Sequence, residues 1–244
     1  MTASTDSSAH SAARDVPWPV VELRRYTLHP GARETMIDLF DRELVETQEE
    51  TGMRILGQFR DEDDPDRFVW MRAFPDMARR TESLTAFYVN GPTWRVHGPA
   101  AGATMVDSSD ALLLRPVGGS LPLAAARAAV GDAGVPGRRM AAAICHRDRP
   151  VDAGFVRAFE DRVRPALAAA GAAPLAWFET ESAPNTFPRL PVRTDTHVFV
   201  WFTAWPDDRL PAEWHEVVET ELSARLTGPP EVLRLSPTAR SLLR

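Results

Sequence analysis

The stretch Phe68-Val-Trp-Met-Arg-Ala-Phe-Pro-Asp76 decides the fold, because it occurs a second time as Phe199-Val-Trp-Phe-Thr-Ala-Trp-Pro-Asp207. Six of the nine positions are identical, which indicates an internal duplication. In each copy the alternation of side chains predicts a strand. The Pro-Asp pair predicts the end of that strand and the cap of a following helix. The chain is therefore expected to contain two similar halves.

The surroundings of each copy predict the same order of elements. In the first half we expect strands at 20–28, 53–60, 68–74 and 111–116, with helices at 31–50 and 76–88. In the second half we expect strands at 140–146, 174–180, 199–205 and 232–237, with helices at 152–170 and 213–226. This βαββαβ order is typical of a ferredoxin-like unit.

A four-stranded sheet that carries helices on one face must cover its other face, and two copies can cover each other. The predicted fold class is α+β, with two tandem ferredoxin-like βαββαβ units that form an intrachain pseudo-dimeric α/β barrel. The expected divisions are a disordered tail at 1–17, a first domain at 18–117, a linker at 118–137 and a second domain at 138–244. Residues 123–130 of the linker could instead form a short helix.

Composition excludes several classes of protein. All 28 basic residues are arginine and the net charge is −6, so no broad positive field attracts nucleic acid or an anionic membrane. The single cysteine, Cys145, excludes an intrachain disulfide and a cysteine-built metal cage. The six histidines lack metal-ligand spacing. We therefore expect no metal site. Because we find no signal peptide and no apolar run of about 18 residues, we expect a cytoplasmic location.

Two blocks of sequence carry a family resemblance. The opening Val21-Glu-Leu-Arg-Arg-Tyr-Thr-Leu-His-Pro-Gly31, the stretch 70–80 and Trp94 resemble the NIPSNAP family over residues 20–116. The second half resembles it only in outline, because it lacks the Glu-Leu-Arg-x-Tyr string. The family is similar to the dimeric α/β barrel superfamily. That likeness implies cofactor-free monooxygenases, haem-degrading or haem-using enzymes, isomerases or cyclases, whereas some NIPSNAP proteins are described as interaction or signalling proteins.

Strand alternation separates two faces of each repeated strand. We expect the smaller residues Val69, Met71 and Ala73 to pack beneath helices, with the broad aromatic face turned into the barrel. The residues then expected in the barrel are Phe68, Trp70, Arg72, Phe74, His197, Phe199, Trp201, Thr203 and Trp205. On the first strand of each half the same reasoning places Glu22, Arg24, Tyr26 and His146 inside, with His146 in the position of Tyr26.

These residues are candidates for a ligand site. The predicted catalytic residues are Tyr26 and His146, as general acid or base, and Arg72, as an anion-binding group. The predicted substrate-binding residues are Glu22, Arg24, Trp70, Trp94, His97, His197 and Trp201. Residues 90–97 are expected to form a loop that caps the mouth. The alternative is structural: Glu22 pairs with an arginine, and the aromatic residues are core.

Two functions follow from this interpretation. The first is a cofactor-independent oxygenase, cyclase or isomerase that binds an aromatic or polyketide-like molecule in the barrel, in bacterial secondary metabolism. The second is a non-catalytic ligand-binding or protein-interaction module on the same fold. Haem is a lesser alternative that would need His146 or His197 as an axial ligand. Whether the chain also forms a homodimer is left open.

Overall fold

The computed structural model describes residues 18–134, 137–205 and 211–244. The expected tail at 1–17 and the expected helix cap at Pro206 and Asp207 lie outside these residues. The first half contains β1 (Val20–Leu28), α1 (Arg33–Leu39), the π-helical segment η1 (Phe40–Leu44), α2 (Val45–Glu49), β2 (Arg54–Asp61), β3 (Arg67–Phe74), α3 (Met77–Tyr88), α4 (Pro92–Thr104), β4 (Met105–Asp107) and β5 (Ala111–Gly119).

The second half repeats this order without counterparts of α4 and β4 among the described residues. It contains β6 (Arg139–Arg147), α5 (Ala153–Ala158), the π-helical segment η2 (Phe159–Val163), α6 (Arg164–Ala169), β7 (Pro174–Thr180), β8 (His197–Trp205), α7 (Ala212–Leu222), the 3-10 segment η3 (Ser223–Arg225) and β9 (Glu231–Pro237). No helix forms between residues 120 and 134, so the alternative of a short helix at 123–130 is wrong.

Local sequence explains where the helices begin. Asp76 caps α3, because its side chain accepts a hydrogen bond of 2.7 Å from the backbone N–H of Arg79. Asp152 caps α5 in the same way, at 2.9 Å from the N–H of Phe155. Before α1 the chain turns at Gly31, whose φ of +76° lies in the region that favours glycine.

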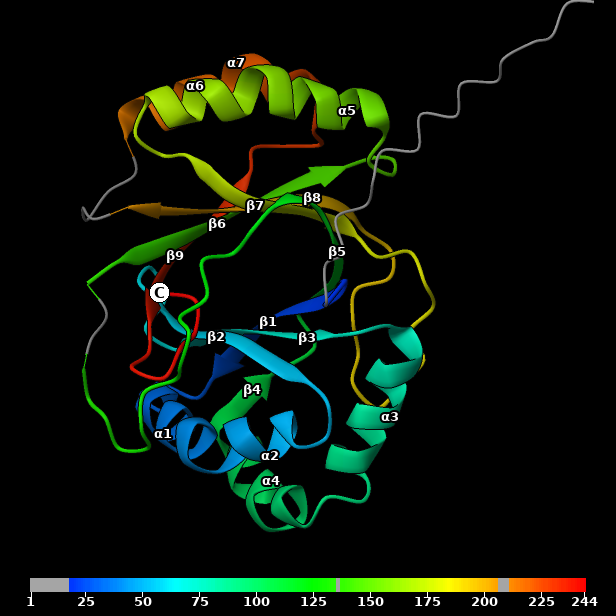
Figure 1. Ribbon diagram of the computed structural model, residues 1–244, viewed down its shortest axis with the longest axis vertical. Helices are drawn as coiled ribbons and strands as arrows, with labels where there is room; N and C mark the ends of the chain where they lie inside the picture. Colours follow the sequence, from blue (N-terminus) through cyan, green and yellow to red (C-terminus); the bar gives the residue numbers. More distant parts are fainter. Residues whose placement is uncertain (1–17, 135–136, 206–210) are drawn as a thin grey trace, which may run out of the picture.

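Eight antiparallel strands close into one barrel. The order around it is β3-β2-β9-β6-β8-β7-β5-β1, and β1 closes the ring by pairing with β3. Two pairings, β2 with β9 and β5 with β7, join the halves. Helices α1 to α4 cover the barrel below and α5 to α7 cover it above (Figure 1). The predicted fold class, an intrachain α/β barrel built from two α+β halves, is confirmed.

The expected direction of the faces is wrong for β1, β3 and β8, but it is right for β6, where His146 shares its face with Met140 and Ile144 of the barrel interior. The barrel interior is filled by the smaller set, with Val69 and Met71 packed against Val200 and Phe202. Phe68 and Trp70 instead lie beneath the helices of the first half, while Phe199 and Trp201 lie beneath those of the second. The physical reason is room: the interior of an eight-stranded barrel holds little more than its own side chains. The layer between sheet and helix accepts the large rings.

The second correction concerns the register of β6. Tyr26 pairs with Phe68, and Cys145 pairs with Phe199, so Cys145 rather than His146 occupies the position of Tyr26. His146 points to the opposite face of β6, at one end of the barrel. The prediction that Tyr26 and His146 are equivalent was therefore wrong by one residue, which in a strand exchanges the two faces.

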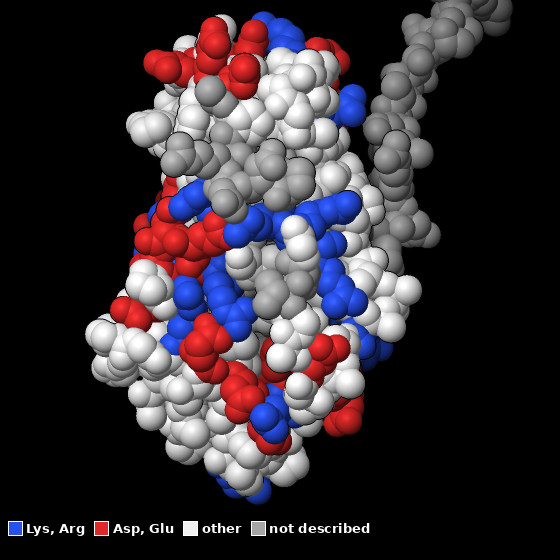
Figure 2. All heavy atoms as spheres, turned by 90° about the vertical axis from the view of Figure 1, so that its left-hand side faces the viewer, with Lys and Arg blue, Asp and Glu red and all other residues white. Residues whose placement is uncertain are grey.

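Ion pairs also join the two halves on the outer surface. Arg139 contacts Glu62 at 2.5 Å, and Arg234 contacts Asp63 at 2.5 Å. On the face shown in Figure 2, arginines and acidic residues are interleaved, so this face offers no continuous positive surface. Within the described ranges, no helix has the length and apolar character needed to cross a membrane.

Candidate functional site

A cavity of about 220 Å³ lies in the first half, between the sheet and the helices that cover it. Strand β1, the segments η1 and α2, and helices α3 and α4 all contribute to its walls. Its aromatic lining residues are Tyr26, Phe40, Trp70, Phe87, Tyr88 and Trp94. The rings pack edge against face, with centroids 4.9 Å apart for Phe40 and Trp70 and 4.7 Å apart for Tyr88 and Trp94. The substrate had been expected inside the barrel, but this cavity lies outside the barrel interior.

The π-helical segment η1 shapes one wall. Phe40 and Leu44 line the cavity from this segment, and Gln48 follows from α2. A π-helical turn widens the helix locally, and such turns are frequent at functional sites. Gln48 is buried, and its amide nitrogen donates to the carbonyl of Leu44 at 2.9 Å, which fixes the amide orientation. Its carbonyl oxygen is then turned toward Arg72, from which it accepts a bond of 3.1 Å.

A cluster of four buried charges lies behind Tyr26, Gln48 and Tyr88, which line the cavity. The carboxylate of Glu22 accepts hydrogen bonds from Arg80 at 2.7 Å, from Arg72 at 2.8 Å and from Arg24 at 3.1 Å. All four side chains are fully buried. Three guanidinium groups thus face one carboxylate, and Glu22 is the single acidic partner that the described residues supply. The cluster carries an excess of two positive charges.

The charge state of the cluster is well defined. Burial alone would raise the pKa of Glu22, but the electrostatic effects of Arg72, Arg24 and Arg80 outweigh burial and hold that pKa well below its usual range. The guanidinium groups stay charged at neutral pH. A buried excess of positive charge is costly unless a negative group offsets it. A negative group bound in the cavity would be separated from the arginines by Tyr26, Gln48 and Tyr88, which line the cavity and accept hydrogen bonds from them.

Both tyrosines of the chain line the cavity and accept hydrogen bonds from the cluster. Arg24 donates to the hydroxyl of Tyr26 at 3.1 Å, and Arg72 donates to the hydroxyl of Tyr88 at 3.0 Å. Burial raises the pKa of Tyr88, although Arg72 acts in the opposite direction. Its O–H proton is therefore retained at neutral pH. Since each oxygen already accepts a bond from an arginine, the O–H groups are available as donors to a ligand.

The duplicated half provides an internal comparison. The strand pairings place Ala141, Ala143, Cys145 and Thr203 in the positions of Glu22, Arg24, Tyr26 and Arg72. The second half therefore builds the same strands without the charged cluster. It follows that this arrangement of strands can form without the charges, while in the first half Glu22 pairs with arginines as the structural alternative expected.

The predicted site residues divide into two groups. Glu22, Arg24, Tyr26, Trp70, Arg72 and Trp94 lie together at or beside the cavity. Trp94 reaches it from α4, because the expected loop at 90–97 is mostly the first turns of that helix. The nitrogen of the Trp70 indole is buried with no hydrogen-bond partner among the described residues.

The other predicted residues lie elsewhere. His97 is half-buried on α4 and contacts Glu43 at 3.5 Å. His146 contacts Thr196 at 3.4 Å, and burial lowers the pKa of its imidazole. His197 and Trp201 belong to the second half, where Trp201 packs against Trp214 with ring centroids 5.9 Å apart. The expected grouping of His146, His97, His197 and Trp201 with Tyr26 is thus wrong.

Three hydrogen-bonding side chains of the site were missed in the sequence, besides apolar lining residues such as Phe40 and Phe87. Gln48, Arg80 and Tyr88 come from helices. Because the aromatic and charged face of the sheet was expected inside the barrel, no helix residue was expected to contact it. One signal was present for Tyr88: the chain has only two tyrosines, and the other was already a candidate. No such signal marks Gln48 or Arg80.

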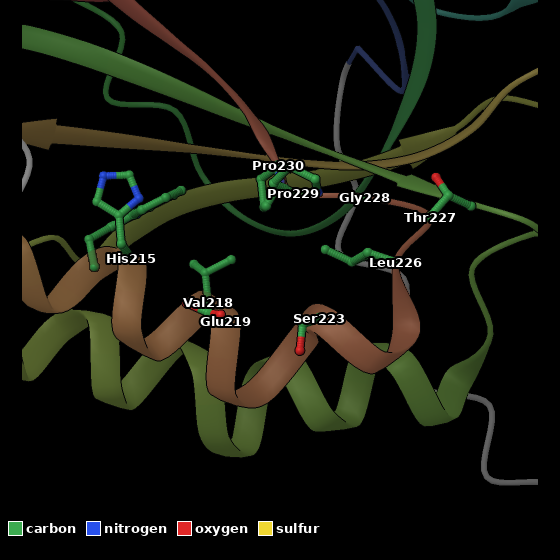
Figure 3. Close-up of a pocket in the computed structure, with 10 residues that line it drawn as sticks. His215, Val218, Glu219, Ser223, Leu226, Thr227, Gly228, Pro229 and Pro230 are labelled. Carbon is green, nitrogen blue, oxygen red and sulfur yellow. The ribbon is translucent and has the colours of Figure 1, made fainter.

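A larger hollow of about 580 Å³ lies in the second half, between α7 and residues 226–230 (Figure 3). It occurs where the chain runs from α7 to β9 without a counterpart of α4. Val218 and Leu226 point into it, while the polar residues His215 and Glu219 are exposed. Because it holds no buried charge, it is a weaker candidate than the cavity of the first half. No group of three or more metal-binding side chains occurs in the described ranges.

The fold and the cavity define an α/β barrel of the dimeric type, completed within one chain. A proposed monooxygenase from Fusobacterium nucleatum is similar over 91% of this chain and 93% of its own, with 10% identity and a TM-score of 0.57. A proposed monooxygenase from Lactobacillus acidophilus gives 12% identity, 93% and 99% coverage and a TM-score of 0.52. An anthrone oxidase-like protein gives 11% identity, 90% and 91% coverage and a TM-score of 0.54. These similarities show a shared fold.

A family resemblance covers the first half. Residues 21–120 match the NIPSNAP family model, so this part of the chain is similar to that family. The resemblance expected from the opening strand is confirmed. A search of curated proteins found no match.

Proposed function

We propose that the cavity of the first half binds a small planar molecule that carries a negatively charged oxygen. One observation supports this most strongly: a buried excess of two positive charges is hydrogen-bonded to Tyr26, Gln48 and Tyr88, which line an aromatic cavity. A carboxylate, phenolate or enolate oxygen would accept hydrogen bonds from the hydroxyls of Tyr26 and Tyr88, and its charge would offset the positive excess behind them. Tyr26, Tyr88 and Trp70 would lie against the ring system.

Cavity size limits the ligand. An apolar cavity of roughly 150 Å³ accepts a benzene molecule. The volume of about 220 Å³ therefore suits one substituted ring or two fused rings. This range agrees with an aromatic or small polyketide-like compound.

The same geometry supports acid–base catalysis without a cofactor. Fixed guanidinium groups in a buried site stabilise an enolate or phenolate as its charge develops, because they need no reorganisation during the reaction. Tyr26 and Tyr88 would donate a hydrogen bond or a proton to that oxygen. Oxygenation, cyclisation and isomerisation can each pass through such an anion, and the proposed monooxygenases among the fold relatives support this class. No histidine is among the described residues lining the cavity, so it offers haem no imidazole ligand.

Matched ligand pairs test the proposal. Binding of 2-naphthoate and of its neutral isostere 2-naphthamide would be measured by calorimetry at pH 7. We expect the carboxylate to bind at least about tenfold more tightly, because charge-assisted hydrogen bonds are roughly twice as strong as neutral ones. Equal affinity of the two compounds would contradict the proposal.

Variants locate the site. Tyr88→Phe removes one hydroxyl and should weaken 2-naphthoate binding, whereas Cys145→Ala, at the position of Tyr26 in the other half, should leave it unchanged. An equal effect of both variants would place the ligand elsewhere. Small molecules that co-purify with the protein, identified by mass spectrometry, would then serve in turnover assays. Binding without turnover would favour the non-catalytic alternative.

A further inference from the structure

The connection between β7 and β8 leaves the second half and packs against the first. In Figure 1 this yellow segment, residues 181–196, runs down beside α3. Phe187 and Val192 are buried in the core beneath the first-half helices. Phe187 lies 6.3 Å from Tyr88 between ring centroids, and Leu190 lines the cavity itself. We refer to residues 181–196 as the strap.

One side chain attaches the strap to the charged cluster. The carbonyl oxygen of Asn185 accepts hydrogen bonds from Arg80 at 3.0 Å and from the N–H of Phe187 at 3.1 Å. Its amide group donates to the carbonyl of Leu190 at 3.0 Å. Asn185 therefore holds the turn that carries Phe187 and Leu190, and it binds this turn to the arginine that pairs with Glu22.

We propose that the strap is the wall by which the second half closes the cavity of the first, and that Leu190 determines the length of ligand accepted. The proposal rests on the proposed function of that cavity. The remaining walls belong to a sheet and to helices held by extensive packing, whereas the strap has no regular structure. Backbone hydrogen bonds from Glu181 to Leu113 and from Arg193 to Ala111 attach it to β5, and between them its side chains hold it. A ligand longer than the cavity must displace Leu190, so the side chain at this position sets the limit.

A test without ligand addresses the attachment of the strap. Arg189 is exposed within it and offers a trypsin site next to Leu190. Asn185→Ala removes the side-chain bonds and should speed cleavage after Arg189 by about tenfold, because proteolysis follows the population of the opened segment. Ser182→Ala, at an exposed strap position, is the control. Equal cleavage of the two variants would show that Asn185 does not hold the strap.

A ligand series tests the role of Leu190. Benzoate, 2-naphthoate and anthracene-2-carboxylate carry the same anion on one, two and three fused rings. We expect Leu190→Ala to improve binding of the three-ring compound by about tenfold, the scale of a few methylene groups in a pocket, and Leu190→Phe to weaken 2-naphthoate. Val192→Ala truncates a strap residue that is absent from the cavity lining, so it should leave the size preference unchanged.

The outcomes separate the two proposals. If the wild-type protein binds none of the carboxylates, the proposed function fails, and the role of Leu190 fails with it. If it binds them but Leu190→Ala keeps the wild-type size preference, or Val192→Ala shifts it equally, the role of Leu190 is overturned while the proposed function stands.

Discussion

Replacing Glu22 by glutamine tests the charge balance of the buried cluster. The substitution keeps the size of the side chain but leaves three buried guanidinium groups without a carboxylate. Removing one partner of a buried ion pair costs about 3–5 kcal/mol. In a domain of this size such a loss corresponds to a fall of roughly 10 °C in Tm. Denaturant unfolding at pH 7 would measure it.

The pH dependence supplies the sharper part of the prediction. In the unfolded chain a glutamate has a pKa of about 4.3. The arginines hold the pKa of folded Glu22 well below that range, so folded Glu22 stays ionised while the unfolded carboxyl takes up a proton. The stability contributed by Glu22 is therefore full above pH 4.3 and falls by about 1.4 kcal/mol per pH unit below it. The stability of Glu22→Gln lacks this decrease, because glutamine has no carboxyl group to protonate.

The difference between the free energies of unfolding of the wild-type protein and Glu22→Gln should thus narrow by about 1.4 kcal/mol between pH 4.3 and pH 3. Glu179→Gln serves as the contrast, because burial raises the pKa of Glu179 and the sign of its linkage is opposite. Parallel stability curves for the wild-type protein and Glu22→Gln would refute the reasoning. So would a loss well below 1 kcal/mol at pH 7, which is the scale of an exposed pair.

Three further outcomes follow from the structure. Burial raises the pKa of Asp41 to about 6, so wild-type stability should fall as the pH rises from 4 to 6. The stability of Asp41→Asn, measured by urea unfolding, should therefore increase by roughly 2 kcal/mol relative to the wild-type protein over that range. A difference between the two proteins that stays constant with pH would contradict this. Burial raises the pKa of the Cys145 thiol, so iodoacetamide should leave the folded protein unmodified and react once it unfolds, as followed by mass spectrometry. Tyr88→Phe should cost only about 1 kcal/mol of stability, because Arg72 keeps Glu22 and Gln48 as partners; a loss above 3 kcal/mol would indicate a structural role instead.

The sequence predicted the architecture because the evidence was repeated within it. Two copies of Phe-Val-Trp, each between helical patterns, were sufficient to predict two βαββαβ units and their pairing. Helix α4 escaped prediction: residues 92–104 contain three glycine or proline residues after its first turn, at Gly98, Pro99 and Gly102, which weaken a helical pattern.

The site was predicted in part, for a reason that alternation explains. Alternation correctly grouped Glu22, Arg24 and Tyr26 on one face with Trp70 and Arg72 on the next strand. It does not say which face meets the helices. The available space decides that question. Rings as large as Trp70 and Trp201 fit in the layer between sheet and helices rather than inside the barrel, and the sequence does not give the width of either space.

The pairing of β2 with β9 and of β5 with β7 has a further consequence. Two identical subunits joined across these edges would present two equal sites, and any change in one would appear in both. Joining the two halves in one chain removes that constraint. The second half has alanine at the positions of Glu22 and Arg24, yet it still supplies half of the barrel and the strap that carries Leu190. Among the described residues one half then carries the charged cluster, so the proposed function predicts one bound ligand per chain.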